Sequence, residues 1–247
     1  MNIRGQVTIF ILVALIVVAF VGFFVVVSNF KGVEKKPQYS FADPVGEFAE
    51  DCLRESAKES VYAVGQGGGY FSLPLDFFEE GVTYHFFNGK SYVPTKSHVE
   101  NELSDAFKEF LPFCIDNFSA FPEVNVSEGE LVPRATVESE QVVFVVNYPL
   151  LVKKGKESVR ITDFGEISVP VKLGLIRGFS QSLVDSQMAG EGICLTCISN
   201  FASENNLTVD VISLDNNSLK LVFKDEGTNF GERGPFEFVF AIKYGEG

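Results

Sequence analysis

The sequence predicts an α+β protein in which a single N-terminal transmembrane helix precedes a globular head of antiparallel β-sheet and about three helices. Three observations lead to this prediction. Residues 7–27 are uncharged and apolar apart from Thr8 and Gly22. The rest of the chain alternates between helical periodicity and runs rich in β-branched and aromatic residues, without a regular strand–helix–strand repeat. Four cysteines are spread through this second, acidic part.

The apolar run is long enough to cross a bilayer. A helix rises about 1.5 Å per residue, and the hydrocarbon core of a membrane is roughly 30 Å thick. The run is rich in Val and Ile, but in lipid every backbone group must be satisfied internally, so we expect it to be helical. We therefore divide the chain into a leader at 1–5, a transmembrane helix at 6–30, a linker at 31–44 and a head at 45–247, with the lipid bilayer as its first partner.

Three interpretations of this segment compete: a plain N-terminal anchor, a removed secretory signal, and a pilin-like leader. The apolar part of a secretory signal runs for about 7–15 residues and ends at a small-x-small cleavage site. Here the run is longer, and the residues at its end, Val26-Val27-Ser28-Asn29, make a poor cleavage site. The anchor and the pilin-like leader are therefore favoured.

The residues at the start of the run read Arg4-Gly5-Gln6-Val7-Thr8-Ile9-Phe10. This opening resembles the class III signal of archaeal type IV pilins and related surface proteins. The resemblance implies cleavage between Gly5 and Gln6, after which the helix stays on the mature protein and can pack against copies of itself or other pilins. Phe10 stands where these pilins usually have Glu, which weighs against filament assembly. The whole chain also resembles uncharacterised archaeal membrane proteins with the same opening and an α+β head.

The orientation of the head rests on opposing signals. Arg4 lies on one side of the helix, and Lys31, Lys35 and Lys36 lie on the other, so the positive-inside bias favours a cytoplasmic head. The cysteines, the glycosylation sequons and the leader favour a head outside the cytoplasm. We expect a single-pass protein of the cell membrane with an extracytoplasmic head.

The charge of the chain argues against a nucleic-acid partner. The net charge is −13, with 33 acidic and 20 basic residues, whereas nucleic-acid binding needs a basic patch. The basic cluster Lys153-Lys154-Gly155-Lys156 is typical of a solvated hairpin tip.

The cysteines predict disulfides. Cys52, Cys114, Cys194 and Cys197 are even in number, as expected of an extracytoplasmic head, and they allow three pairings. We expect two disulfides, at least one of them joining the region of Cys194 and Cys197 to a distant helix. The CxxC spacing leaves two alternatives, a redox centre or a zinc site completed by the other two cysteines. The redox alternative is weakened because a helix precedes the motif and the usual Trp and Pro are missing.

Four sequons of the form Asn-x-Ser/Thr are candidate glycan acceptors if the head lies outside. None has Pro in its middle position, and they fall in predicted loops or at the ends of elements. They begin at Asn117, Asn125, Asn206 and Asn216.

The first half of the head predicts two helices and a hairpin. Asp43 as N-cap and Pro44 at the first position open a helix whose apolar residues, from Val45 to Val64, recur at spacings of three and four. The glycines of residues 65–69 end it; no Gly-Lys-Ser/Thr follows, so we interpret them as a turn rather than a phosphate loop. Residues 70–75 predict a strand, and Asn88-Gly89 predicts a hairpin over 84–93. Ser97 with Glu100 forms a capping box for a second helix, which Pro112 ends or kinks near Cys114.

The second half turns to β from about Ala135. We expect strands over 141–152 and 159–173, and then a helical stretch over 178–205 that is interrupted at 190–192 and carries the CxxC in its second part. An antiparallel meander over 208–214, 219–224 and 236–244 completes the head. The 26 Phe and the absence of Trp predict a Phe-packed core.

No catalytic residue, cofactor or metal site is predicted. The sequence has no nucleophile elbow, HExxH, P-loop or dinucleotide fingerprint, and its two histidines are His85 in a strand and His98 at a helix start. We predict a membrane-anchored cell-surface protein, a pilin-like subunit or minor pilin acting in assembly and adhesion. The alternatives are a non-assembling anchored binding module of the cell envelope and an envelope thiol–disulfide protein that uses the CxxC.

Overall fold

A computed structural model describes residues 40–79, 81–214 and 217–243. The chain divides into two compact units, Met1–Ser40 and Phe41–Gly247, and all but one of the described residues belong to the second. The predicted leader, the transmembrane helix and most of the linker lie outside the described residues. Within those residues, no helix combines the length and apolarity that a membrane crossing needs.

The head is α+β, as predicted, with mostly antiparallel sheets. In the described ranges the α-helices are α2 (Asp43–Gln66), α3 (Lys96–Ile115), α4 (Leu173–Met188) and α5 (Leu195–Glu204). Short 3-10 turns are η1 (Leu75–Phe77), η2 (Asp116–Phe118) and η3 (Gly231–Arg233).

Three sheets are formed by the described strands. The largest has the order β1-β2-β12-β11-β10, with β3 also on β2. Its strands are β1 (Phe78–Glu79), β2 (Val82–Phe87), β3 (Lys90–Ser91), β10 (Thr208–Ser213), β11 (Ser218–Asn229) and β12 (Pro235–Lys243). The second contains β4 (Asn125–Glu128), β7 (Leu150–Lys154) and β8 (Glu157–Ile161), and the third contains β5 (Val132–Val137), β6 (Gln141–Asn147) and β9 (Glu166–Pro170). Of the pairings among described strands, only that of β2 with β12 is parallel.

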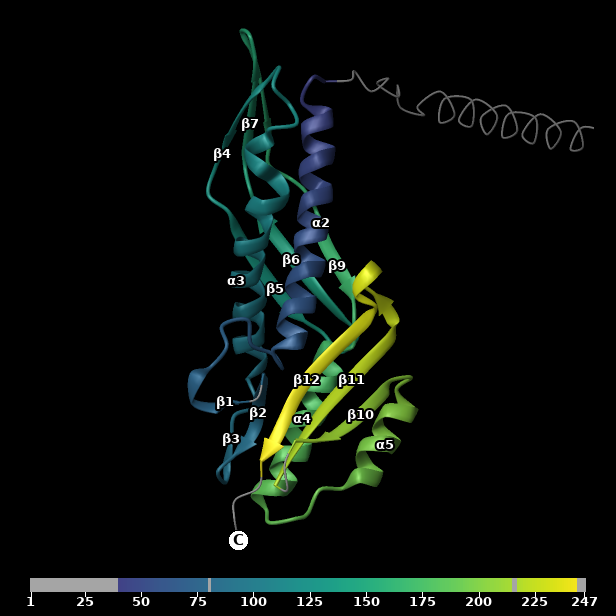
Figure 1. The fold of residues 1–247 in the computed structure, drawn as a ribbon. Helices are drawn as coiled ribbons and strands as arrows, with labels where there is room; N and C mark the ends of the chain where they lie inside the picture. Colours follow the sequence, from purple (N-terminus) through teal and green to yellow (C-terminus); the bar gives the residue numbers. More distant parts are fainter. Residues whose placement is uncertain (1–39, 80, 215–216, 244–247) are drawn as a thin grey trace, which may run out of the picture. The chain divides into compact units, whose positions relative to one another are not determined.

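The helices α2 and α3 lie side by side and antiparallel, with α3 against β5 (Figure 1). The apolar stripe of α2 that the sequence predicts is buried, from Val45 to Val64. Helix α4 contacts β2 and β6, and α5 contacts β10. The elements thus close around a main apolar core, and a smaller apolar cluster lies on β2, β11 and β12.

Phenylalanine dominates that core, as the composition predicts. Phe107 on α3 and Phe144 on β6 pack with ring centroids 5.4 Å apart. Each side chain of this size that is removed from water stabilises the fold by about 1.5–3 kcal/mol. The Phe residues with less than 2% exposure are Phe107, Phe144, Phe223, Phe236, Phe238 and Phe240.

Several predicted boundaries were wrong by a few residues. Helix α2 has Ala42 as its N-cap, so Asp43 is its first residue, although Pro44 is in the first turn as predicted. Helix α3 is capped by Thr95, whose hydroxyl accepts from the His98 N–H at 3.2 Å. Glu100 does not close a capping box, because its carboxylate accepts from the backbone N–H of Val137 at 3.0 Å.

Helix α3 includes Pro112 and ends at Ile115, next to Cys114, near which the sequence predicts its end or a kink. Two further boundaries extend beyond the prediction. The β region begins at Asn125, earlier than Ala135, and α4 begins at Leu173.

The predicted strand over 70–75 is absent from the structure. These residues form an irregular loop that leads into the 3-10 turn Leu75–Phe77. The N–H groups of Phe71 and Ser72 both donate to one carboxylate oxygen of Glu102, each at 2.7 Å. A side chain of α3 therefore takes the donors that a strand ladder would have used.

Candidate functional site

An exposed disulfide between Cys194 and Cys197 lies at the N-terminus of α5. The sulfur–sulfur distance is 1.97 Å and the Cα atoms are 5.1 Å apart. Cys194 is the N-cap residue, and its Sγ accepts a hydrogen bond from the Cys197 N–H at 3.1 Å. Both cysteines are exposed. The preceding turn depends on Gly190, whose φ of 83° lies in the left-handed region that glycine enters without strain.

The second disulfide joins Cys52 on α2 to Cys114 on α3. Its sulfur–sulfur distance is 2.07 Å, its Cα atoms are 5.5 Å apart, and Cys52 is buried. The prediction of two disulfides is confirmed, but the expected link from Cys194 or Cys197 to a distant helix was wrong. Antiparallel packing brings Cys52 and Cys114 together, whereas the CxxC cysteines meet within one helical turn.

The zinc alternative is wrong for the same reason, because the four cysteines form two separate pairs. Across the described ranges, no group of three or more His, Cys, Asp or Glu residues is arranged to hold a metal ion.

The two disulfides constrain the unfolded chain very differently. Cys52 and Cys114 are 62 residues apart, whereas Cys194 and Cys197 are 3 apart. In the chain-entropy account, closing loops of these lengths stabilises a fold by about 4 kcal/mol and by less than about 2 kcal/mol, respectively. The buried disulfide is therefore a stabilising cross-link between two helices, whereas the exposed disulfide adds little to the stability of the fold.

The exposed disulfide stands on a well-anchored helix. The ring of Phe201 on α5 stacks on that of Phe179 on α4, with centroids 3.9 Å apart, and both rings meet the edge of Phe223 on β11. Ile198, in the first turn of α5, is completely buried. Leu195, between the two cysteines in sequence, is 53% exposed. The buried face of α5 thus fixes the position of the helix, while the two sulfurs at its N-terminus are open to solvent.

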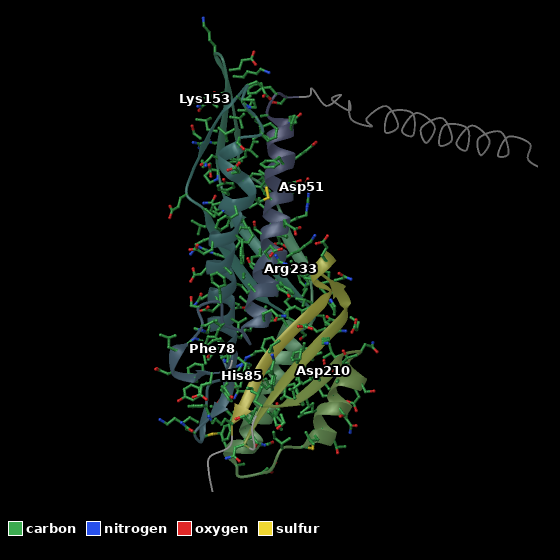
Figure 2. The ribbon with its side chains drawn as sticks, in the orientation of Figure 1. Asp51, Phe78, His85, Lys153, Asp210 and Arg233 are labelled. Carbon is green, nitrogen blue, oxygen red and sulfur yellow. A yellow bond between two sulfur atoms is a disulfide. The ribbon has the colours of Figure 1, made fainter. Side chains whose placement is uncertain are left out.

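The predicted position of His85 in a strand is confirmed, and its ring is buried among the aromatic side chains of the core (Figure 2). The ring stacks on Phe240, with centroids 4.4 Å apart. Nε2 lies 2.8 Å from the carbonyl of Gly68, so it carries the proton, and Nδ1 accepts from the hydroxyl of Ser180 at 2.5 Å. Burial lowers the pKa of His85 to about 3. The ring is a neutral, satisfied polar group of the core.

Gly68, whose carbonyl accepts from His85, belongs to the glycine-rich segment at the end of α2, which forms a turn as predicted. Gly68 has a φ of 65°, and a Cβ there would lie 2.6 Å from the carbonyl oxygen of Val239. The glycine therefore permits a close approach of two backbones.

Residues 70–77, which we call the apolar loop, form a second exposed feature. Besides the bonds to Glu102, Tyr70 donates its hydroxyl to the carbonyl of Tyr92 at 2.8 Å, and Phe77 stacks on the Tyr92 ring at 4.2 Å. Burial raises the pKa of Tyr70 to about 12, with a further contribution from the charge of Glu102. Leu75 is 90% exposed. The loop thus holds an apolar side chain in solvent on a backbone fixed by hydrogen bonds.

Sequence reasoning did not identify the apolar loop as a site. The available signal was the density of apolar residues between glycines, which we interpreted as a strand. His98 borders the loop: its ring centroid lies 4.9 Å from that of Tyr70, and its side chain is 42% exposed.

Three of the four predicted glycan acceptors lie on the surface of the head. Asn117 and Asn206 are exposed and have φ values of 50° and 49°, and Asn125 is exposed at the start of β4. Asn216 and the predicted cleavage residues Gly5 and Gln6 lie outside the described residues. Glycosylation and cleavage stay predictions. The lysine cluster forms the tip between β7 and β8, as predicted, with Lys153 exposed (Figure 2).

Comparison of the chain with protein-family models, with curated proteins and with solved structures found no match.

Proposed function

We propose that this chain is a membrane-anchored cell-surface protein, a pilin-like subunit or minor pilin that acts in assembly and adhesion. Its head, residues 45–247, would lie outside the cytoplasm. The observation that carries the proposal is the pairing of Cys52 with Cys114 and of Cys194 with Cys197. Disulfides form and persist in oxidising compartments and are rare in the cytosol. The apolar run at 7–27 supplies the anchor.

The apolar loop supports a role exerted through contact with other proteins. Exposed apolar side chains on a fixed backbone lose little conformational freedom when a partner covers them. Leu73 and Leu75 of the loop are 45% and 90% exposed. We assign the loop to contacts between neighbouring subunits of the assembly, in addition to packing of the N-terminal helix.

The runner-up is a non-assembling anchored module that binds an envelope glycan or protein. Two features of the sequence favour it. Phe10 stands where the pilins that the opening resembles usually have Glu, and Pro37, after Lys35-Lys36, is expected to end the N-terminal helix, whereas a filament subunit uses a long helix to pack against its copies.

Mass spectrometry of the protein from its native membrane tests the processing. A mature chain that begins at Gln6 is expected, with Asn2→Ala processed normally and Gly5→Phe retaining the leader. A chain beginning at Met1 would reject pilin-type maturation, and one beginning after Ser28 would indicate an ordinary signal peptide.

Electron microscopy of sheared surface appendages, with peptide identification, tests assembly. We expect the chain in filaments, and we expect Leu73→Ser/Leu75→Ser to reduce its amount there without loss of the folded head. Leu195→Ser, which removes an exposed leucine elsewhere, is the matched control. Absence of the chain from every filament, with abundance in the membrane fraction, would favour the anchored module.

A further inference from the structure

We propose that the Cys194–Cys197 disulfide is redox-active and oxidises the dithiol of an exposed protein segment. This activity goes beyond the proposed function and does not depend on it, because it needs only the head. It uses a bond that lies in solvent at the start of α5, between two cysteines that are both exposed.

The local geometry assigns different roles to the two sulfurs. Cys194 Sγ is at the N-cap, where it accepts the Cys197 N–H at 3.1 Å and faces the positive end of the helix dipole. Both features stabilise a thiolate on this sulfur once the disulfide is broken, and a stabilised thiolate is a good leaving group. Cys194 is therefore the residue that forms the bond to the substrate, and Cys197 is its partner.

The exchange proceeds in two displacements. A substrate thiolate attacks Cys194 Sγ; the Cys194–Cys197 bond breaks, and its electron pair leaves on Cys197 Sγ, which takes up a proton. The second substrate thiolate then attacks the substrate sulfur of the mixed disulfide, and Cys194 leaves as the thiolate. The substrate loses two electrons and gains a disulfide, while the protein gains a dithiol. The reverse exchange with a second protein disulfide restores the oxidised state.

The fold does not need this bond to hold α5 in place. Ile198 is completely buried, and the stacked rings of Phe179 and Phe201 fix the helix on α4. A ring closed between residues 3 apart also restricts the unfolded chain little. Cys52–Cys114 is the opposite case, since it is largely buried and joins two helices. The Cys52–Cys114 bond can therefore serve as an internal control when the reactivity of Cys194–Cys197 is measured.

The surroundings indicate the substrate class. Leu195, which lies between the two cysteines in sequence, is 53% exposed, and it can contact an apolar side chain beside a substrate cysteine. We therefore expect a polypeptide whose two thiols are accessible and flanked by apolar residues.

Titration of the full chain with dithiothreitol, followed by thiol labelling and peptide mapping, tests the bond itself. We expect two labelled thiols per chain, Cys194 and Cys197, under conditions that leave Cys52 and Cys114 unlabelled. Exchange at the first pair should be faster by about tenfold or more, because its sulfurs are exposed. Equal rates at the two bonds would overturn the proposal.

A synthetic peptide with two cysteines flanked by leucines tests the direction and the roles. The oxidised chain should convert one equivalent of this dithiol to the disulfide, and Thr196→Ala, which keeps both cysteines, should do the same. With the peptide disulfide as probe, Cys197→Ser should trap a mixed disulfide on Cys194, and Cys194→Ser should trap about tenfold less. Equal trapping, or no peptide oxidation, would contradict the proposal. So would loss of the folded head in Cys194→Ser/Cys197→Ser, since the bond would then be structural.

Discussion

Two buried polar side chains, His85 and Asp225, connect elements that are far apart in sequence. His85 joins β2 to the glycine turn and to α4 through Gly68 and Ser180. Asp225, which is 2% exposed, accepts from the backbone N–H and the Nζ of Lys172 at the start of α4. The sequence showed His85 in a strand but not its partners, because these lie on separate elements and meet only in the folded chain.

His85 gives the head a specific response to acid. Its folded pKa of about 3 is below the usual 6.5, so the unfolded chain binds a proton that the folded head excludes. Stability is therefore full above about pH 6.5 and falls as the pH drops toward 3, by up to about 1.4 kcal/mol per pH unit. We expect His85→Gln to be less stable at pH 7 but to have a flatter dependence between pH 7 and 5. Urea unfolding at a series of pH values measures this; an unchanged slope in the variant would contradict it.

Substitution of Asp225 tests how much a buried, ion-paired carboxylate contributes to the free energy of unfolding. Asp225→Ala should lower the free energy of unfolding by about 3–5 kcal/mol, because it leaves Lys172 and several donors without their acceptor. The matched control is Asp210→Ala, which removes an exposed carboxylate 2.9 Å from Lys224 and should cost less than about 1 kcal/mol. Equal losses in urea unfolding would show that the burial of Asp225 is unimportant.

At the scale of elements, periodicity predicted the long helices and the meander. The apolar spacing of α2 and the Asn88-Gly89 turn appear in the structure as expected. The strand predicted over 70–75 failed because Glu102, on a helix that follows it, takes its backbone donors. The disulfide pairing could not be predicted, since it depends on how α2 and α3 pack. Local patterns thus determine elements, whereas contacts between elements determine the candidate sites.

The two disulfides should differ in what they contribute to the stability of these elements. Cys52→Ser/Cys114→Ser should lower the free energy of unfolding by about 2–4 kcal/mol, and Cys194→Ser/Cys197→Ser by a smaller amount. Denaturant unfolding of the two double variants under the same conditions measures the difference. A larger loss for the CxxC pair would contradict the assignment of Cys52–Cys114 as the cross-link.

At the scale of the whole molecule, composition predicts an anchor that is distinct from the head. The apolar run is uncharged, yet the chain has a net charge of −13. An acidic protein is repelled by anionic lipid, so we expect the N-terminal helix, and not the head, to hold the protein at the membrane. The sequence alone leads to this division, because membrane crossing depends on the length and apolarity of one continuous segment.

The location of the head is the central claim, and the lysines at the tip between β7 and β8 provide the most direct test. Lys153, Lys154 and Lys156 are exposed. Intact native cells would be treated with a membrane-impermeant amine reagent, and the labelled peptides identified by mass spectrometry, with a cytosolic protein as control. The account predicts labelling of these lysines in intact cells. Labelling only after lysis, with the chain in the membrane fraction, would place the head in the cytoplasm and contradict it.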